Sequence, residues 1–179
     1  DGAGNRGPAV NLGQNTTTAV APQVGWSGSE FIVSWLDASG RIRASRVTAA
    51  GTILDPGGVS LVTGAQEFAL ASNGNALAWT LATDGGLRFA HVTPSPPSIG
   101  ASQITATTRA SSELSIETNA TGRVLLAWSQ VRQGANREPW ALLEDAGAPV
   151  RVGTGTGDEW SPRALFESTA ASVIFGDGN

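Results

Sequence analysis

The chain has 179 residues, a length that suits one sizeable domain with a hydrophobic core. Its formal net charge is −4 and it contains no basic stretch, which disfavours nucleic-acid binding because that needs clustered cations. The absence of cysteine excludes disulfide bonds, thiol catalysis and cysteine-based zinc sites. No apolar run approaches the roughly 20 residues of a membrane-spanning helix. Methionine is absent even at position 1, so we expect a processed or excised piece of a longer protein.

The predicted elements are short β-strands, because glycine and proline cut the apolar residues into runs of strand length. Residues 1–8 and 94–97 are expected to form loops. In chain order, the expected strands cover residues 9–12, 22–26, 31–36, 41–45, 59–62, 68–71, 76–81, 87–92, 103–105, 114–117, 123–129, 140–143, 150–152, 163–166 and 172–175. The fourth of these, residues 41–45, is expected to end or bulge at Arg46-Val47, where the alternation of polar and apolar residues slips.

One phrase recurs along the chain and organises these strands. It runs Phe31-Ile32-Val33-Ser34-Trp35 and returns in strands that end at Trp79, at Trp128 and, weakened, at Phe175. The spacings of 44, 49 and 47 residues indicate a structural repeat. A four-stranded repeat cannot bury both of its faces alone, so neighbouring repeats must stack. The pattern therefore predicts an all-β fold, a β-propeller of four-stranded antiparallel blades, and a β-sandwich is the alternative.

The repeats divide a single domain into three full units and a partial fourth. One interpretation closes a four-bladed ring, in which Val10-Asn11-Leu12 supplies the last strand of the fourth blade. The other interpretation is a fragment, roughly half of a seven-bladed ring, completed by another segment or copy. We favour the second, because an unpaired strand edge at each end invites association. The approximate units are 19–66, 67–111, 112–157, and 158–179 together with 1–18.

The first repeat resembles the propeller repeats of large secreted or surface proteins of bacteria. The resemblance is good in the first unit and partial in the next two. It rests on Pro22, Val24, Trp26, Gly28, Phe31, Val33, Trp35, Asp37, Ile42, Arg46, Val47, Gly51, Leu54 and Asp55. It implies a propeller outside the cell or at its surface and specifies no activity. The Trp-Asp pairs, the sialidase box and the kelch Gly-Gly signature of other propellers are missing.

No spacing in the chain identifies a catalytic or metal site. His91 is the only histidine, which excludes a site with two histidine ligands and leaves no Ser-His-Asp set that the sequence supports. Two carboxylates suffice for a glycosidase, but no pair stands out. Asp177-Gly178-Asn179 and residues 1–5 contain oxygen ligands suited to Ca²⁺. Neither carries a complete calcium-binding loop, so we expect no metal and no cofactor.

Three tryptophans lie outside the repeated phrase and are the candidate binding residues: Trp26, Trp140 and Trp160. An exposed tryptophan can stack on a sugar ring or anchor a protein partner. Trp160 is the strongest candidate, because Asp158 and Glu159 precede it. The alternative is local packing, since glutamate followed by an apolar residue recurs at a spacing of 46 residues in the earlier units.

The sequence therefore favours a non-catalytic binding or scaffold module that recognises a protein or a glycan. The alternatives are a fragment of a propeller-fold glycosidase or lyase, and a purely structural repeat array. We expect an extracellular or cell-surface location. We also expect self-association or a second chain that completes the ring, and neither nucleic-acid binding nor a membrane span.

Overall fold

The computed structural model describes residues 9–13, 18–105, 111–131, 136–153 and 158–177. Every regular element in these residues is a β-strand, and they include no helix able to span a membrane. The strands are β1 (Ala19–Trp26), β2 (Glu30–Asp37), β3 (Ile42–Thr48), β4 (Val59–Val62), β5 (Ala65–Leu70), β6 (Ala76–Leu81), β7 (Leu87–Pro94), β8 (Pro97–Ile99), β9 (Gln103–Thr105), β10 (Ser111–Thr118), β11 (Val124–Val131), β12 (Arg137–Leu143), β13 (Val150–Arg151), β14 (Glu159–Glu167) and β15 (Ala170–Asp177).

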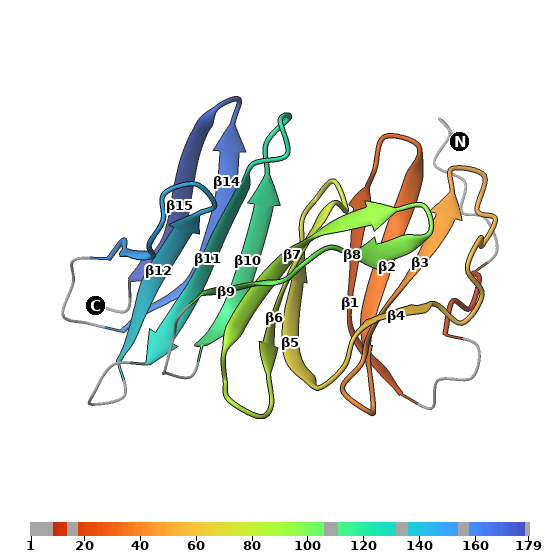
Figure 1. The fold of residues 1–179 in the computed structure, drawn as a ribbon, viewed down its shortest axis with the longest axis horizontal. Coiled ribbons are helices and arrows are strands. Elements are labelled where there is room, and N and C mark those ends of the chain that lie inside the picture. The colour runs from red at the N-terminus through yellow and green to blue at the C-terminus, as the bar shows by residue number, and fades with distance from the viewer. Residues whose placement is uncertain (1–8, 14–17, 106–110, 132–135, 154–157, 178–179) are drawn as a thin grey trace.

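The strands form four antiparallel sheets that follow one another in chain order. Sheet one is β1-β2-β3-β4, sheet two contains β5 to β9, sheet three is β10-β11-β12-β13, and sheet four is β14-β15. In sheet two, β8 and β9 both pair with β7, at opposite ends of it. The sheets stand side by side in a row, with sheet one at one end and sheet four at the other (Figure 1).

The same irregularity occurs in the first strand of every sheet, which shows that the sheets share one design. The pairing register with the second strand shifts once in each of β1, β5, β10 and β14. At three of these shifts a residue other than glycine adopts a left-handed backbone, with φ of 51° at Ala21, 55° at Glu113 and 52° at Ser161. An extra residue of this kind bends a strand and increases its local twist.

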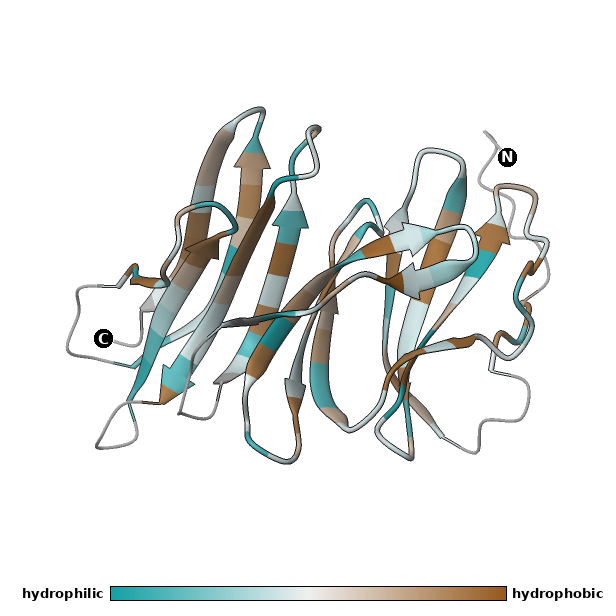
Figure 2. Ribbon diagram, in the orientation of Figure 1, coloured by the Kyte–Doolittle hydropathy of each residue, from teal (hydrophilic) through white to brown (hydrophobic). Residues whose placement is uncertain are grey.

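The hydrophobic core lies between the sheets. Successive side chains of a strand point to opposite faces, so each sheet has a leading face toward the preceding sheet and a trailing face toward the next. Figure 2 shows this alternation as bands along β10. Three buried clusters fill the contacts between sheets one and two, two and three, and three and four. The second cluster, for example, joins Ala76, Ala78 and Phe89 of sheet two to Leu126 and Trp128 of sheet three.

The repeated tryptophans pack on the leading faces of the sheets. Trp79 joins the cluster shared with sheet one, and Trp128 joins the cluster shared with sheet two. These large rings therefore pack against the adjacent sheet, as the repeat predicted. Among the described residues no sheet precedes that of Trp35, and the turn before β4 covers this side chain, so that a Cβ atom at Gly58 would lie 2.4 Å from the indole.

Three expectations about strands are wrong. The described residues 9–13 contain no strand, and the carbonyl of Leu12 accepts a hydrogen bond from the amide of Gly57 at 3.2 Å. This places Leu12 beside sheet one, so it does not add to sheet four as closure of a four-bladed ring would require. Pro94 and Pro97, expected in a loop, belong to the β7-β8 hairpin. β3 continues past Arg46 to Thr48, because its backbone pairing with β2 outlasts the alternation of its side chains.

Candidate protein-binding groove

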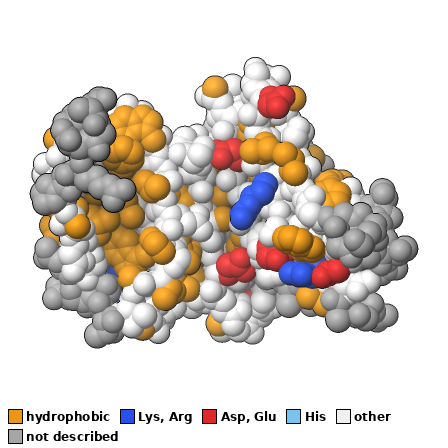
Figure 3. Space-filling model, turned by 180° about the vertical axis from the view of Figure 1, so that it is seen from behind, with side chains coloured by type: hydrophobic (Ala, Val, Ile, Leu, Met, Phe, Trp, Pro, Cys, Tyr) orange, Lys and Arg blue, Asp and Glu red, His pale blue; other side chains and the backbone are white. Residues whose placement is uncertain are grey.

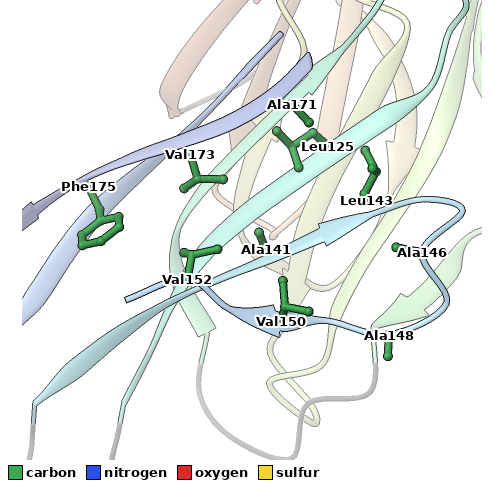
Figure 4. A pocket seen from close by; sticks show the side chains of 10 residues that line it. All are labelled: Leu125, Ala141, Leu143, Ala146, Ala148, Val150, Val152, Ala171, Val173 and Phe175. Carbon is green, nitrogen blue, oxygen red and sulfur yellow. The ribbon is translucent and has the colours of Figure 1, made fainter. Parts of the chain in front are cut away.

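An apolar groove of about 370 Å³ lies between sheet three and β15. Leu125, Ala141 and Leu143 line it from sheet three, and Val173 and Phe175 line it from β15 (Figure 4). The other lining residues are Ala146, Ala148, Val150, Val152 and Ala171. All of these side chains are hydrophobic, so the groove offers shape and apolar surface rather than charge.

The groove follows from the alternation of side chains along β15. Val173 pairs with Ala164 of β14, and Ile174 pairs with Arg163. Because successive side chains point to opposite faces, Val173 faces sheet three while Ile174 faces away from it. Val173 also packs against the buried cluster between sheets three and four. The groove therefore opens directly from the hydrophobic core of that contact.

A third strand covers the corresponding position in the two earlier sheet contacts. Ala90 and Val92 of β7 share a buried cluster with Ile42 of β3. Leu142 of β12 shares a buried cluster with Phe89 of β7. In the part of the chain that the structure describes, sheet four consists of β14 and β15 alone. Apolar side chains of β12 therefore face the groove where the other contacts hold a strand.

β15 also presents a backbone edge to the groove. One of its edges pairs with β14 from Ala170 to Asp177, and no strand among the described residues pairs with the other. Amide and carbonyl groups along such an edge can bind an extended segment as an added strand. The edge and the groove together suit a β-strand with apolar side chains at alternate positions.

The three candidate tryptophans lie in different sheets and different environments. Trp26 is 40% exposed and packs on Phe31, with ring centroids 4.7 Å apart and an interplanar angle of 54°. Trp160 is 42% exposed and lies over Gly176, where an added Cβ would be 3.2 Å from the indole. Trp140 is partly buried against the cluster between sheets two and three. Trp140 is therefore a packing residue, while Trp26 and Trp160 present rings to solvent.

The two carboxylates that precede Trp160 interact with arginines. Asp158 accepts hydrogen bonds from Nη2 and from the backbone amide of Arg137, both at 2.8 Å, and this pairing lowers the pKa of Asp158. Glu159 is only 3% exposed, and its Oε2 lies 4.0 Å from Nη2 of Arg151. The carboxylates are thus engaged within the fold rather than grouped around the indole of Trp160. A role for these residues in ligand binding stays a prediction.

Asp37 and Asp55 also accept hydrogen bonds from arginine side chains. Asp37 accepts hydrogen bonds from the amide of Ser39 at 2.9 Å and from Nε of Arg43 at 3.0 Å. Burial alone would raise the pKa of Asp37, but these hydrogen bonds outweigh it and lower the pKa well below its ordinary value. Arg46 donates from Nε to Asp55 at 2.8 Å and lowers the pKa of that carboxyl. These carboxylates remain ionised at neutral pH.

His91 forms a polar contact between sheets two and three. Its Nε2 lies 2.8 Å from Oε1 of Glu144, and Nε2 of Gln103 donates to the same oxygen at 3.3 Å. The described residues include no group of three or more potential ligands arranged to hold a metal ion. The calcium candidates, residues 1–5 and Asp177-Gly178-Asn179, lie outside the described side chains.

The sequence contains one signal for the groove, in the residues of β15. Ala171, Val173 and Phe175 are apolar at alternate positions, and the fourth repeat was expected to supply only two strands at the C-terminal end. That pattern predicts a half-buried strand. It does not reveal which surface of sheet three the strand leaves open, because the opposite side of the groove comes from residues 125–152, which are distant from the strand in the sequence.

Four-stranded antiparallel meanders that stack face to face in chain order are blades of a β-propeller. Sheets one to three are such blades, and the two described strands of sheet four form part of a fourth. No protein-family model matches the sequence, and no curated protein matches it. The β-propeller domain of Cps50 (Swd1) from Myceliophteria thermophila is similar, with a TM-score of 0.52 and 15% identity. The match covers 82% of this chain and 46% of that one. This likeness shows the fold alone.

Two further solved structures are similar at lower scores. TolB from Acinetobacter baumannii matches with a TM-score of 0.49 and 12% identity, over 89% of this chain and 41% of that one. A chain of the nidogen/laminin complex matches with a TM-score of 0.48 and 13% identity, over 80% of this chain and 51% of that one. The chain spans about half the length of these solved structures.

Proposed function

We propose that the chain is a non-catalytic protein-binding module in which blade four captures an extended segment of a partner polypeptide. The observation that carries the proposal is the apolar groove beside the unpaired edge of β15. The captured segment runs antiparallel to β15 and takes the position that β7 holds in blade two and β12 holds in blade three. Its alternate apolar side chains enter the groove, and its backbone bonds to β15.

Two favourable terms support capture of a strand at this place. Each backbone hydrogen bond with the edge contributes about 0.5–1.5 kcal/mol net. Apolar surface removed from water contributes roughly 25 cal/mol per Å². Val150, Ala146 and Ala148 are exposed in the groove, so an inserted segment buries them. The interaction is therefore driven by burial and by backbone pairing, and salt affects it little.

Three carboxylates are unsuited to act as the general acid of a glycosidase or lyase. Hydrogen bonds keep Asp37, Asp55 and Asp158 ionised, whereas a general acid must hold a proton near neutral pH. The proposal places the module outside the cell or at its surface, on the basis of the repeat resemblance in blade one. Fractionation of cells that produce the protein tests this location, and recovery only from the cytosol would contradict it.

The test uses a synthetic peptide with the sequence of β7, residues Leu87–Pro94, because β7 fills the third-strand position in blade two. We expect saturable binding of the labelled peptide in fluorescence anisotropy, and none of a scrambled peptide that lacks the alternation. Ala171→Glu places a charge at the groove and should weaken binding about tenfold or more.

Ser172→Glu is the matched control, since Ser172 is the exposed neighbour on the opposite face of β15. It should bind the peptide like the parent chain. No saturable binding of the β7 peptide, or equal loss in both variants, would overturn the proposal.

A further inference from the structure

The leading face of blade one is built like a buried blade contact and is open to solvent. Val24 pairs with Val33, two residues before Trp35, and the corresponding positions are Leu70, Ile116 and Ala164 in the later blades. Those three side chains are 9%, 4% and 5% exposed, whereas Val24 is 60% exposed. Figure 3 shows hydrophobic side chains gathered at the end of the molecule formed by sheet one. The position that each later blade buries against its predecessor is therefore open in blade one.

Trp26 and Phe31 extend this open surface. They pair with each other across β1 and β2, and Trp26 lies two residues after Val24, on the same face of the sheet. Both rings are more than one third exposed. An aromatic pair beside a valine forms a contiguous apolar surface, and such a surface marks an interaction site. We call Val24, Trp26 and Phe31 the leading surface.

The trailing face of blade four is the opposite half of the same kind of contact. Ile174 lies one residue before Phe175, and the corresponding positions in the earlier blades are Ser34, Ala78 and Ala127. Those three are fully buried, each at 0% exposure, whereas Ile174 is 60% exposed. Leu165 and Trp160 also present exposed apolar side chains from β14. We call Ile174, Leu165 and Trp160 the trailing surface.

A polar group on blade four occupies the position that links one blade to the next. In blade one, Nε2 of Gln23 donates to the carbonyl of Phe68 in blade two at 2.9 Å. Arg163 holds the corresponding position in blade four. Gln23 pairs with Ser34, the residue before Trp35, and Arg163 pairs with Ile174, the residue before Phe175. A guanidinium only donates hydrogen bonds, so the group it suits in a following blade is a carbonyl. Phe68 lies two residues before Leu70, and Pro22 lies two residues before Val24, which corresponds to Leu70. If a second copy followed blade four, its Pro22 carbonyl would therefore take the place of the Phe68 carbonyl.

We infer that copies of this chain associate head to tail, with the leading surface of one copy against the trailing surface of the next. A second copy is the occupant because one chain carries both halves of the contact. The apolar leading surface meets the apolar trailing surface, and Arg163 donates to the backbone of β1 in the adjoining copy. The contact is heterologous, so it uses different surfaces on the two copies and leaves one surface of each kind free. The groove beside β15 lies on the other face of sheet four and is not part of this contact.

The test measures mass in solution by sedimentation velocity across a wide concentration range. We expect the parent chain to exceed its monomer mass of 18.2 kDa as concentration rises. Val24→Glu disrupts the leading surface and Ile174→Glu disrupts the trailing surface, so each variant alone should remain monomeric. An equal mixture of the two should form a one-to-one dimer, because each partner contributes its intact surface. Val131→Glu, at an exposed valine outside both surfaces, should associate like the parent.

Arg163→Ala provides a variant that introduces no charge at the contact. It should weaken association about tenfold, and circular dichroism of each variant should match that of the parent. A parent chain that stays at 18.2 kDa at every concentration would overturn the inference. So would an associating parent whose two glutamate variants remain monomeric when mixed. Binding of the β7 peptide is measured separately and should be unchanged in Ile174→Glu, so the two proposals can fail independently.

Discussion

The side-chain amide of Gln23 joins blade one to blade two by accepting a hydrogen bond from the amide of Leu70 at 2.7 Å. The same side chain donates to the carbonyl of Phe68 at 2.9 Å. One residue of β1 thus satisfies two backbone groups of β5. This is a polar link across a contact that is otherwise hydrophobic, and it sets how the two sheets sit against each other.

Loss of this link should destabilise the chain. We expect Gln23→Ala to lower the free energy of unfolding by about 1–3 kcal/mol, because it leaves backbone groups of Phe68 and Leu70 without partners. Urea denaturation followed by circular dichroism measures the change. Gln66→Ala, at an exposed position of β5, should change stability by no more than about 0.5 kcal/mol. Equal effects of the two variants would contradict a structural role for Gln23.

A side chain at Gly58 should be poorly tolerated. Gly58 has a φ of 70°, and a Cβ there would lie 2.4 Å from the buried indole of Trp35. Gly51→Ala is the matched control, since Gly51 has a φ of 85° and no atom within 4 Å of the added Cβ. The control should lose about 1–2 kcal/mol from backbone strain alone. Gly58→Ala should lose more than this in thermal unfolding, and an equal loss would show that Trp35 does not press on this turn.

The hydrogen bonds to Asp37 should make stability fall in acid. They lower the pKa of folded Asp37, so its contribution is fully present above the unfolded value of 3.8 and is lost as the pH falls below that value. We expect Asp37→Asn to lower the free energy of unfolding at pH 7 by about 1–3 kcal/mol. The variant should also lose less stability on acidification than the parent chain does.

Asp84→Asn is the control for this experiment. Asp84 is exposed and pairs with Arg88 at 3.1 Å, so its replacement should cost no more than about 1 kcal/mol. Urea denaturation at several pH values compares the three proteins. An unchanged acid profile in Asp37→Asn would show that other groups control the loss of stability.

A tryptophan buried between blades should contribute more to stability than a tryptophan exposed at the surface. Trp128 is fully buried between blades two and three, so Trp128→Ala should lower the free energy of unfolding by about 3–5 kcal/mol. Trp160→Ala removes an exposed ring and should cost about 1 kcal/mol or less. Chemical denaturation measures both changes, and similar losses would contradict the assignment of Trp160 to the surface.

Much of the fold could be predicted because its signals are local. Alternating apolar residues and flanking turn residues specify strands 59–62, 76–81 and 103–105, and the structure has strands at these positions. The spacing of Trp35, Trp79 and Trp128 indicated stacked blades, which the sheets confirm. Such patterns depend on neighbours within a few residues, so a sequence displays them directly.

The candidate site could not be predicted to the same degree. Trp140 and Trp160 were both candidate binding residues, yet Trp140 packs against a core cluster and Trp160 presents its ring to solvent. The difference arises because blade two lies against Trp140, whereas in the described part of the chain no blade follows Trp160. Leu12, expected on blade four, lies instead beside Gly57.

By itself, the sequence determined the strands, their alternation and the repeat that makes each sheet a blade. Only the tertiary structure decided which faces are covered, and so where the groove beside β15 and the two open surfaces lie. The physical reason is that strand formation follows from the pattern of adjacent side chains. Burial depends on which distant segment packs against a face, and the pattern within a strand contains no information about that segment.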